Sequence, residues 1–210
     1  MVNMENLKAI DKVLQKKIGW TPHPAQQEIL DNLGQYTAIC AGARFGKTML
    51  ASYIALRQLL FPNQHIWVVA PTYGLTEKIY NYLSQWLAKG FSNDVKKGLI
   101  TLSDRRGESK IVNKLTNSWI EFKSADPNSL PSLLGEELDL VIIDEAPRVP
   151  RIAWESYIYQ RLTSRNGKAI FIGTPKGKGW FYEEFVKGQD PKIKDNVSFT
   201  FTSKDNLSLK

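Results

Sequence analysis

Residues 36–60 read YTAICAGARFGKTMLASYIALRQLL, and this stretch decides the fold. It begins with an apolar run rich in strand-forming residues, 36–41, and ends with a long apolar segment of helical character, 47–60. The loop between them contains small residues, which let backbone N–H groups turn inward around an anion, and the helix that follows adds the positive end of its dipole. The stretch therefore predicts a phosphate-binding loop.

The loop reads AGARFGKT at residues 41–48 and departs from the usual pattern G-x-x-x-x-G-K-[ST] only at its first position, Ala41. In such a loop Lys47 reaches the β- and γ-phosphates and the Thr48 hydroxyl ligates magnesium. The alternative is a glycine turn before an ordinary helix with an exposed lysine, which the preceding strand disfavours. We expect ATP and Mg²⁺ as ligands, with nucleotide contacts from Gly42, Ala43, Arg44, Phe45, Gly46, Lys47 and Thr48.

Other apolar runs lie on both sides of this loop along the chain. Residues 65–70, 138–143 and 168–173 read as buried strands, each with a helical segment after it, and 197–201 reads as a last strand. Residues 110–115 and 118–123 instead alternate apolar and polar side chains, which predicts antiparallel strands joined by a tight turn. We expect an α/β fold with a mainly parallel central sheet, flanking helices and an antiparallel addition.

Composition and length are those of a folded domain with one core. The chain has 210 residues, 42% of them hydrophobic and 23% charged, and a formal charge of +7 that favours a polyanionic partner. A single cysteine, Cys40, indicates a reducing compartment, and the charged N-terminal residues lack the apolar stretch of a signal peptide or membrane span. We expect an N-terminal helical segment that carries the adenine-binding motif (1–35), a P-loop ATPase core (36–203) and the start of a linker (204–210).

Two adjacent carboxylates, Asp144 and Glu145, close the strand predicted over 138–143. A nucleotide hydrolase needs one carboxylate at the carboxyl edge of a strand for the magnesium shell and a neighbour to polarise the attacking water. We assign Asp144 to the metal and Glu145 to the water. An acidic cap of the following helix is the alternative, and the phosphate loop upstream favours the catalytic role.

Three further side chains are candidates around the nucleotide. Gln26, with Gln27 second, carries an amide that can pair with the adenine edge, unless it is a solvated glutamine on a helix surface. Arg44 can contact the γ-phosphate or Glu145, and is otherwise an exposed loop arginine. Thr174 follows a predicted strand; it can hydrogen-bond the hydrolytic water and couple ATP state to movement, or it belongs to a simple turn.

The segments PHPAQQEIL, AGARFGKT, LDLVIIDEA and IFIGTPKGKGWFYEEF, in this order and spacing, resemble the ATPase domain of the large terminase subunit of tailed bacteriophages. The resemblance spans about residues 22–206 and implies a P-loop NTPase of the RecA-like, ASCE type. It implies a motor in the host cell cytoplasm that pumps double-stranded DNA into an empty capsid using ATP. The partners it implies are the portal protein, the capsid, the small terminase subunit and a homo-oligomeric ring, expected to be a pentamer. The isolated domain, without the family's C-terminal nuclease domain, is expected to be monomeric.

One departure from the family concerns an arginine that acts on the neighbouring subunit's ATP. In many members it precedes the glycine about ten residues before the acidic pair, whereas here Leu134 precedes Gly135. The arginine therefore stays unassigned. The candidates are Arg148, Arg151, Arg161 and Arg165, followed by Arg105 and Arg106.

Two basic clusters could grip DNA, namely Lys176 with Lys178, and Arg105 with Arg106. A motor that grips duplex of any sequence needs phosphate contacts without base reading, so we predict DNA binding first at the lysines and then at the arginines. Solvated loops are the alternative. Two other functions stay open: a RecA-like helicase or translocase, which needs a second such domain, and a nucleotide-dependent assembly module with negligible turnover alone.

Overall fold

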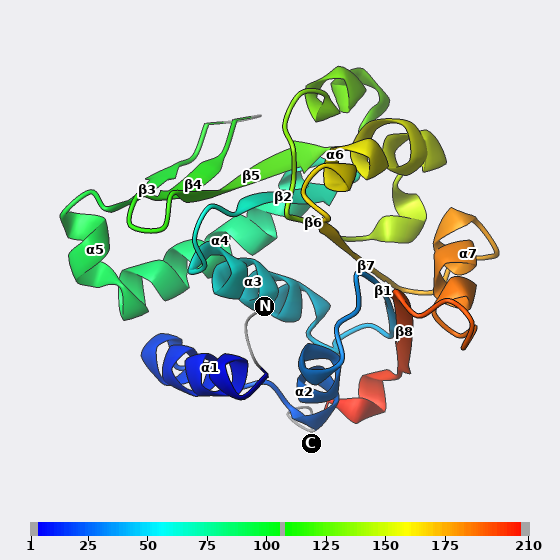
Figure 1. The fold of residues 1–210 in the computed structure, drawn as a ribbon, viewed down its shortest axis with the longest axis horizontal. Helices are drawn as coiled ribbons and strands as arrows, with labels where there is room; N and C mark the ends of the chain where they lie inside the picture. Colours follow the sequence, from blue (N-terminus) through cyan, green and yellow to red (C-terminus); the bar gives the residue numbers. More distant parts are fainter. Residues whose placement is uncertain (1–3, 106–107, 207–210) are drawn as a thin grey trace.

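The computed structural model describes residues 4–105 and 108–206. In this part of the chain one eight-stranded sheet has the order β3-β4-β5-β2-β6-β7-β1-β8 (Figure 1). Neighbours from β5 to β8 pair in parallel, whereas β4 pairs antiparallel with both β3 and β5. This is the expected mainly parallel α/β sheet with an antiparallel addition. The strands are β1 (Tyr36–Ala41), β2 (His65–Ala70), β3 (Ile100–Ser103), β4 (Lys110–Asn113), β5 (Ser118–Ser124), β6 (Leu140–Ile143), β7 (Lys168–Gly173) and β8 (Asn196–Phe201).

Helices cover both faces of the sheet (Figure 1). Among the described residues, no helix is both long enough and apolar enough to cross a bilayer. The α-helices are α1 (Met4–Ile18), α2 (Pro24–Asp31), α3 (Lys47–Leu59), α4 (Tyr73–Gly90), α5 (Ser92–Lys96), α6 (Tyr159–Thr163) and α7 (Trp180–Lys187). Shorter turns are η1 (Pro127–Leu133), η2 (Ala146–Arg148), η3 (Ala153–Ile158) and η4 (Ser203–Asp205), of which η3 is π-helical.

The apolar strands have no polar face because each side of the sheet packs against helices. In β2, Ile66 and Val68 pack with the core under α1 to α4, while Trp67 and Val69 pack with the core under η1, η3, α6 and α7. Successive side chains of a strand point to opposite faces, so a strand buried on both faces reads as a continuous apolar run. The sheet is therefore covered by a hydrophobic core on each face.

Two parts of the architecture differ from the sequence-based expectation. The edge strand β3 was not predicted; it is defined by its pairing with β4, in which Thr101 lies opposite Val112. The helical segment predicted after the strand at 138–143 begins as the π-helical η3 and continues as α6. The antiparallel pair was predicted, and β5 also joins β2 in parallel, which connects it to the main sheet.

A buried ion pair fixes α1 to the helix that follows the phosphate loop. Asp11 in α1 accepts hydrogen bonds from the Tyr53 hydroxyl at 2.6 Å and from Arg57 Nη1 at 3.1 Å, both in α3. Asp11 is 5% exposed and Arg57 9%. A buried charge is tolerated only when it is paired and hydrogen-bonded, so these contacts lock the position of α1 on α3.

Candidate nucleotide site at the carboxyl edge of the sheet

The predicted functional segments meet at one edge of the sheet. β6, β7 and β1 are parallel neighbours, so their carboxyl ends lie side by side. The phosphate loop follows β1, the acidic pair follows β6, and Thr174 follows β7. Ligands of open α/β sheets bind in this position, because the loops at the carboxyl ends of the strands converge there.

Lys47, the first residue of α3, folds back over its own loop. Its Nζ donates to the carbonyl oxygens of Ala41 (2.9 Å) and Gly42 (2.8 Å) and to Thr174 Oγ1 (3.2 Å). Burial lowers the pKa of the Lys47 ammonium, while the carboxylates of Glu145 and Asp144 act in the opposite direction. The ammonium is thus held between the loop and the acidic strand end, where a polyphosphate would replace its three oxygen partners.

Gln26 and His23, at the N-terminus of α2, hold two carbonyl groups of the phosphate loop. His23 Nε2 lies 3.0 Å from the Phe45 carbonyl oxygen, and Gln26 Nε2 donates to the Gly46 carbonyl oxygen at 3.2 Å. In a trans peptide the C=O of one residue and the N–H of the next point in opposite directions. Bonds that hold the carbonyls of Phe45 and Gly46 on the α2 side therefore point the N–H groups of Gly46 and Lys47 away from it, as an anion cradle requires.

The Gln26 amide has no group free for adenine in this structure. Gln26 is 3% exposed, and its Oε1 accepts the N–H of His23 at 3.1 Å, which closes a capping box at the start of α2. Adenine recognition by Gln26 stays a prediction and would require these bonds to be exchanged. Gln27, the second choice, bonds Asp31 of its own helix at 2.9 Å.

The residues in the middle of the loop differ in burial: Phe45 anchors the loop, whereas Ala43 and Arg44 face solvent. The Phe45 ring is fully buried, stacks on Phe201 with ring centroids 5.1 Å apart, and meets His23 edge-on at 4.9 Å. Phe45 therefore anchors the loop, and only its backbone is available to a ligand. Ala43 and Arg44 are exposed, and Arg44 has a left-handed backbone with φ of 62°, a conformation that costs a non-glycine residue free energy.

Gly46 needs to be glycine for two reasons. Its φ is 91°, in the left-handed region, and a Cβ built on it would lie 2.7 Å from Gln26 Nε2. The glycine of the motif therefore permits both the turn into α3 and the close approach of the Gln26 amide.

The acidic pair lies where the sequence places it. Asp144 is 5% exposed, and its Oδ1 accepts the N–H of Glu145 at 3.0 Å. The pKa of the Asp144 carboxyl is raised to about 6, mainly by burial and also by the charge of Glu145, although the hydrogen bond from the Glu145 N–H and the charges of Lys47 and Lys78 act to lower it. Glu145 has φ of 52°, and strained backbone of this kind clusters at functional sites.

Asp144 and Thr48 fit a magnesium ion that arrives with a nucleotide. The burial that raises the Asp144 pKa is a cost that a neighbouring cation would offset. The Thr48 hydroxyl has no hydrogen-bond partner among the residues that the structure describes. The described residues also contain no group of three or more His, Cys, Asp or Glu that could hold a metal by themselves. One carboxylate and one hydroxyl match the sparse protein ligation of Mg²⁺ held mainly by phosphates and water.

The arginines near the acidic strand differ in how they are engaged. Arg151 pairs with Glu155 and Glu183. Arg161 Nε donates to the Tyr157 carbonyl oxygen at 3.4 Å, and Arg165 Nε bonds Asp139 at 2.9 Å. In contrast, Arg148 in η2 is exposed and makes no side-chain hydrogen bond or ion pair with any described residue. Leu134, at the usual arginine position, is 53% exposed.

Of the predicted DNA contacts, Lys176 and Lys178 lie in the exposed loop that follows Thr174. Lys178 Nζ lies 5.9 Å from the centre of the Tyr182 ring. The loop thus starts at Thr174, which accepts a hydrogen bond from Lys47. Its role as a DNA surface stays a prediction. Arg106 lies outside the described residues.

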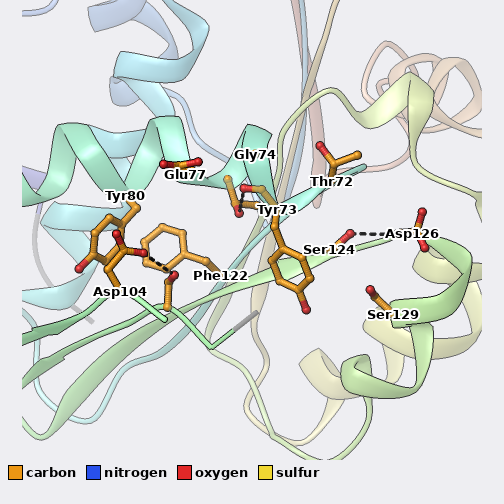
Figure 2. A pocket seen from close by; sticks show the side chains of 12 residues that line it. Thr72, Tyr73, Gly74, Glu77, Tyr80, Asp104, Phe122, Ser124, Asp126 and Ser129 are labelled. Carbon is orange, nitrogen blue, oxygen red and sulfur yellow. Dashed lines mark hydrogen bonds between the residues drawn. The ribbon is translucent and has the colours of Figure 1, made fainter. Parts of the chain in front are cut away.

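A cavity of about 700 Å³ opens beside the Arg105 loop, at the carboxyl ends of β2 and β5 (Figure 2). Figure 2 shows Glu77 on α4 at one side of this cavity and Asp126 at the other, and Asp104, the neighbour of Arg105, also lines it. These three carboxylates repel DNA phosphates. Arg105 is therefore a weaker candidate for a DNA contact than Lys176 and Lys178.

Three residues at the phosphate loop were missed from the sequence. His23, Phe201 and Asn206 contact the carbonyl or the ring of loop residues, and Asn206 Nδ2 donates to the Arg44 carbonyl oxygen at 2.7 Å. The only local signal is the stretch TSKD at 202–205, which has the pattern of a capping box. Their contacts arise from residues that are distant in the sequence.

Comparison with known proteins agrees with this geometry. A model of the DEAD/DEAH box helicase family matches residues 23–176, from His23 to Lys176. The chain belongs to this family. Among curated proteins, the large terminase subunit of Thermus virus P23-45 is 32% identical over 205 residues, which is 92% of this chain and 42% of that protein. The chain spans about two fifths of the length of the curated relatives it matches.

Solved structures show the same relationship. The large terminase ATPase domain of Thermus phage P74-26 superposes with a TM-score of 0.74 at 26% identity, over 89% of this chain and 83% of that one. The large terminase of a thermophilic bacteriophage, solved in complex with ATP-γ-S, has a TM-score of 0.56 at 21% identity, over 95% of this chain and 46% of that one, which shows the fold alone. The resemblance to the ATPase domain of large terminases, and the P-loop fold that it implies, are thereby confirmed.

Proposed function

We propose that the chain is the ATP-hydrolysing motor domain of a phage large terminase and powers the packaging of double-stranded DNA into a capsid. The observation that carries the proposal is the convergence of Lys47, Thr174 and the Asp144-Glu145 pair at the carboxyl ends of three adjacent parallel strands. The curated relatives are named as this subunit, and the terminase of the thermophilic bacteriophage, which shares the fold, is described in complex with ATP-γ-S.

Nucleotide binding follows from the groups that the loop presents. The N–H groups of Gly46 and Lys47 point away from α2, and the N-terminus of α3 adds its dipole, so the phosphates are held by backbone donors. Lys47 exchanges its bonds to Ala41, Gly42 and Thr174 for phosphate oxygens. Asp144 and Thr48 would hold magnesium, which when bound neutralises charge on the β- and γ-phosphates.

Hydrolysis requires a base for the attacking water, and Glu145 is our assignment. As the water oxygen bonds the γ-phosphorus, the bond to the bridging oxygen of ADP breaks and the Glu145 carboxylate takes the water proton. Asp144 orients its neighbour by accepting the Glu145 N–H, and the left-handed backbone of Glu145 is held by this bond and by η2. Arg44, exposed at the loop, is the candidate for a contact with the γ-phosphate.

Thr174 is the candidate coupling residue. In this structure its hydroxyl accepts a bond from Lys47, and that bond is lost when Lys47 turns to the phosphates. The hydroxyl can then donate to the γ-phosphate or the attacking water, and the loop that begins at Thr174 carries Lys176 and Lys178. ATP state and DNA grip would thus be coupled through the end of β7.

Arg148 is our choice for the arginine that completes a neighbouring site. It is the member of the group Arg148, Arg151, Arg161 and Arg165 that has no partner in the described part of the chain. An arginine supplied by a neighbour accelerates hydrolysis by about 10³ to 10⁵ in related enzymes, so the isolated chain should be a slow, largely monomeric ATPase. The ring, the portal protein, the small terminase subunit, the linker at 204–210 and the cytoplasmic site of action belong to this proposal.

The test is steady-state ATPase activity measured over a range of protein concentrations, with and without duplex DNA. Glu145→Gln should bind Mg-ATP as the unmodified chain does and lose at least about 99% of turnover, whereas Lys47→Ala should lose binding. Glu155→Gln, an exposed carboxylate in η3, is the matched control and should keep its activity. A Glu145→Gln variant that keeps most of its activity would show that another group is the base.

A DEAD-type helicase is the second candidate, because the family model that matches the chain carries that description. A helicase would be stimulated most by single strands or by strand ends and would separate a duplex. A packaging motor would be stimulated by blunt or closed duplex DNA and would leave the strands paired. Turnover that stays negligible at every concentration and with every DNA would favour the assembly module.

A further inference from the structure

The chain returns to the phosphate loop after β8. β8 is the edge strand next to β1, with Cys40 opposite Thr200 and Ala41 opposite Phe201, so its end lies beside the start of the loop. Figure 1 shows the red end of the described chain close to α2. Residues 201–206 thereby reach the loop from the side opposite to β7.

Contacts link this segment to successive residues of the loop. The Gly42 N–H donates to the Phe201 carbonyl oxygen at 3.1 Å, and Asn206 Nδ2 donates to the Arg44 carbonyl oxygen at 2.7 Å. The rings of Phe45 and Phe201 stack at 5.1 Å with 12° between their planes. Loop residues 42, 44 and 45 are therefore each fixed by the segment after β8.

The segment has its own internal structure. Thr202 accepts the N–H of Lys204 at 3.2 Å, and Asp205 Oδ2 accepts the N–H and the hydroxyl of Thr202 at 2.6 and 2.9 Å. The hydrogen bond from the Thr202 N–H also lowers the pKa of the Asp205 carboxyl. This capping box folds η4 as a turn and places Asn206 against the loop.

Gly42 admits this turn because it has no side chain. A Cβ built on Gly42 would lie 2.9 Å from Ser203 Oγ and 3.0 Å from Ser203 N, closer than such atoms approach without displacement. The sequence motif suggests that Gly42 gives access to phosphate. In the structure its small size is used by the segment after β8.

The bond from Asn206 acts on the peptide group between Arg44 and Phe45, in the middle of the phosphate loop. Because the C=O of Arg44 points to Asn206, the N–H of Phe45 points away from Asn206. The Phe45 N–H has no acceptor among the described residues. Arg44 also has the strained φ of 62°, so the hydrogen bond from Asn206 stabilises a backbone conformation that is unfavourable by itself.

We propose that Asn206 is a positioning residue of the nucleotide site, and that residues 201–206 hold the phosphate loop in its anion-binding shape. Nucleotide affinity then depends on the position of the chain that follows β8, and occupancy of the site in turn stabilises that segment. The inference rests on the proposed function, because it assumes that the loop binds ATP. It assigns a role to a residue outside the phosphate-loop motif.

The test compares the full chain with Asn206→Ala, Asn206→Gln and Asn32→Ala in calorimetric titrations with Mg-ATP. Asn32 also donates its amide to a backbone carbonyl, that of Glu28 at 2.8 Å, at the far end of α2, so it is the matched control. Because Asn206→Ala loses one hydrogen bond, its affinity for Mg-ATP should be about 3- to 10-fold lower, with kcat unchanged. Asn206→Gln should restore binding to within about 2-fold, and Asn32→Ala should stay within the same limit.

A double-mutant cycle with Gly42→Ala tests the geometry. If Gly42→Ala displaces η4, it already breaks the Asn206 bond, and Asn206→Ala should then add less than about 2-fold. Fully additive losses would contradict the inference, as would an Asn206→Ala variant with unchanged affinity while the unmodified chain binds ATP.

Amide hydrogen exchange in the nucleotide-free protein gives a readout that does not need ATP. The Gly42 N–H, which donates to the Phe201 carbonyl oxygen at 3.1 Å, should exchange at least about 3-fold faster in Asn206→Ala and at an unchanged rate in Asn32→Ala. Unchanged exchange at Gly42 would overturn the inference. If the unmodified chain fails to bind Mg-ATP although Asn206→Ala speeds this exchange, the proposed function fails and the positioning role is retained.

Discussion

Replacing Asp144 with Asn should stabilise the nucleotide-free protein, although it removes the proposed magnesium ligand. Asp144 is 5% exposed, and burial raises the pKa of its carboxyl from 3.8 to about 6. The folded state thus holds its proton more tightly than the unfolded state, so ionisation destabilises the protein as pH rises through this range. Asn keeps an oxygen to accept the Glu145 N–H and carries no charge to bury.

The size of the effect follows from the two pKa values. At 1.36 kcal/mol for each pKa unit, a rise from 3.8 to about 6 costs about 3 kcal/mol once Asp144 is fully ionised. Below about pH 4 both side chains are neutral and the two proteins should be equally stable. The advantage of Asp144→Asn should grow between about pH 4 and 6 and then stay constant.

The assay is urea unfolding of both proteins from pH 4 to pH 8 without nucleotide or divalent cation. Asp195→Asn is the control, because Asp195 is exposed and makes no side-chain hydrogen bond with a described residue. Its stability should change by less than about 0.5 kcal/mol. Mg-ATP should stabilise the unmodified chain more than Asp144→Asn. A stability difference that does not vary with pH would refute the reasoning, because the burial cost would then not come from ionisation.

Three other outcomes follow from the structure. Arg57→Met should cost about 3 kcal/mol in urea unfolding, because it leaves the buried Asp11 carboxylate without its ion-pair partner, and adding Asp11→Asn should recover part of that loss. Thr174→Val should lower kcat at least about tenfold with little change in the Kd for Mg-ATP, because Lys47 loses only a partner that it releases on binding; equal changes in both would argue against coupling. Lys176→Gln with Lys178→Gln should weaken binding to unrelated duplexes equally and should flatten the slope of log affinity against log salt concentration by about one unit per lost phosphate contact. The control, Lys192→Gln with Lys194→Gln in another exposed loop, should show neither effect. An unchanged slope would place the DNA surface elsewhere.

Elements whose signals are local were predictable from the sequence. The bounds of β1, β2 and β7 agree with the sequence-based prediction residue for residue. These strands are buried on both faces, so each reads as an unbroken apolar run that ends where polar or glycine residues begin. The phosphate loop was equally visible, because the strand before it and the helix after it are adjacent in the sequence.

Convergence of the site was also predictable, because parallel strands place their carboxyl ends at one edge. If 36–41, 138–143 and 168–173 are parallel strands of one sheet, the residues that follow them lie at the same edge, which puts Asp144, Glu145 and Thr174 on the side of Lys47. The sequence did not predict which of these side chains form hydrogen bonds with one another. Nothing local indicates that Lys47 bonds Thr174, 127 residues away, or that the Gln26 amide is used by the loop itself.

Tertiary structure alone decided the edges of the sheet and the contacts that these edges make. β3 has four residues with no decisive pattern, and pairing with β4 makes it a strand. β8 was visible as a strand, but its place beside β1 depends on the strand order of the whole sheet. That order brings Asn206 to Arg44 across 162 residues of sequence. Sequence periodicity reports which face of an element is buried, whereas a hydrogen bond between distant segments depends on the positions of both in space, and only the folded chain defines these.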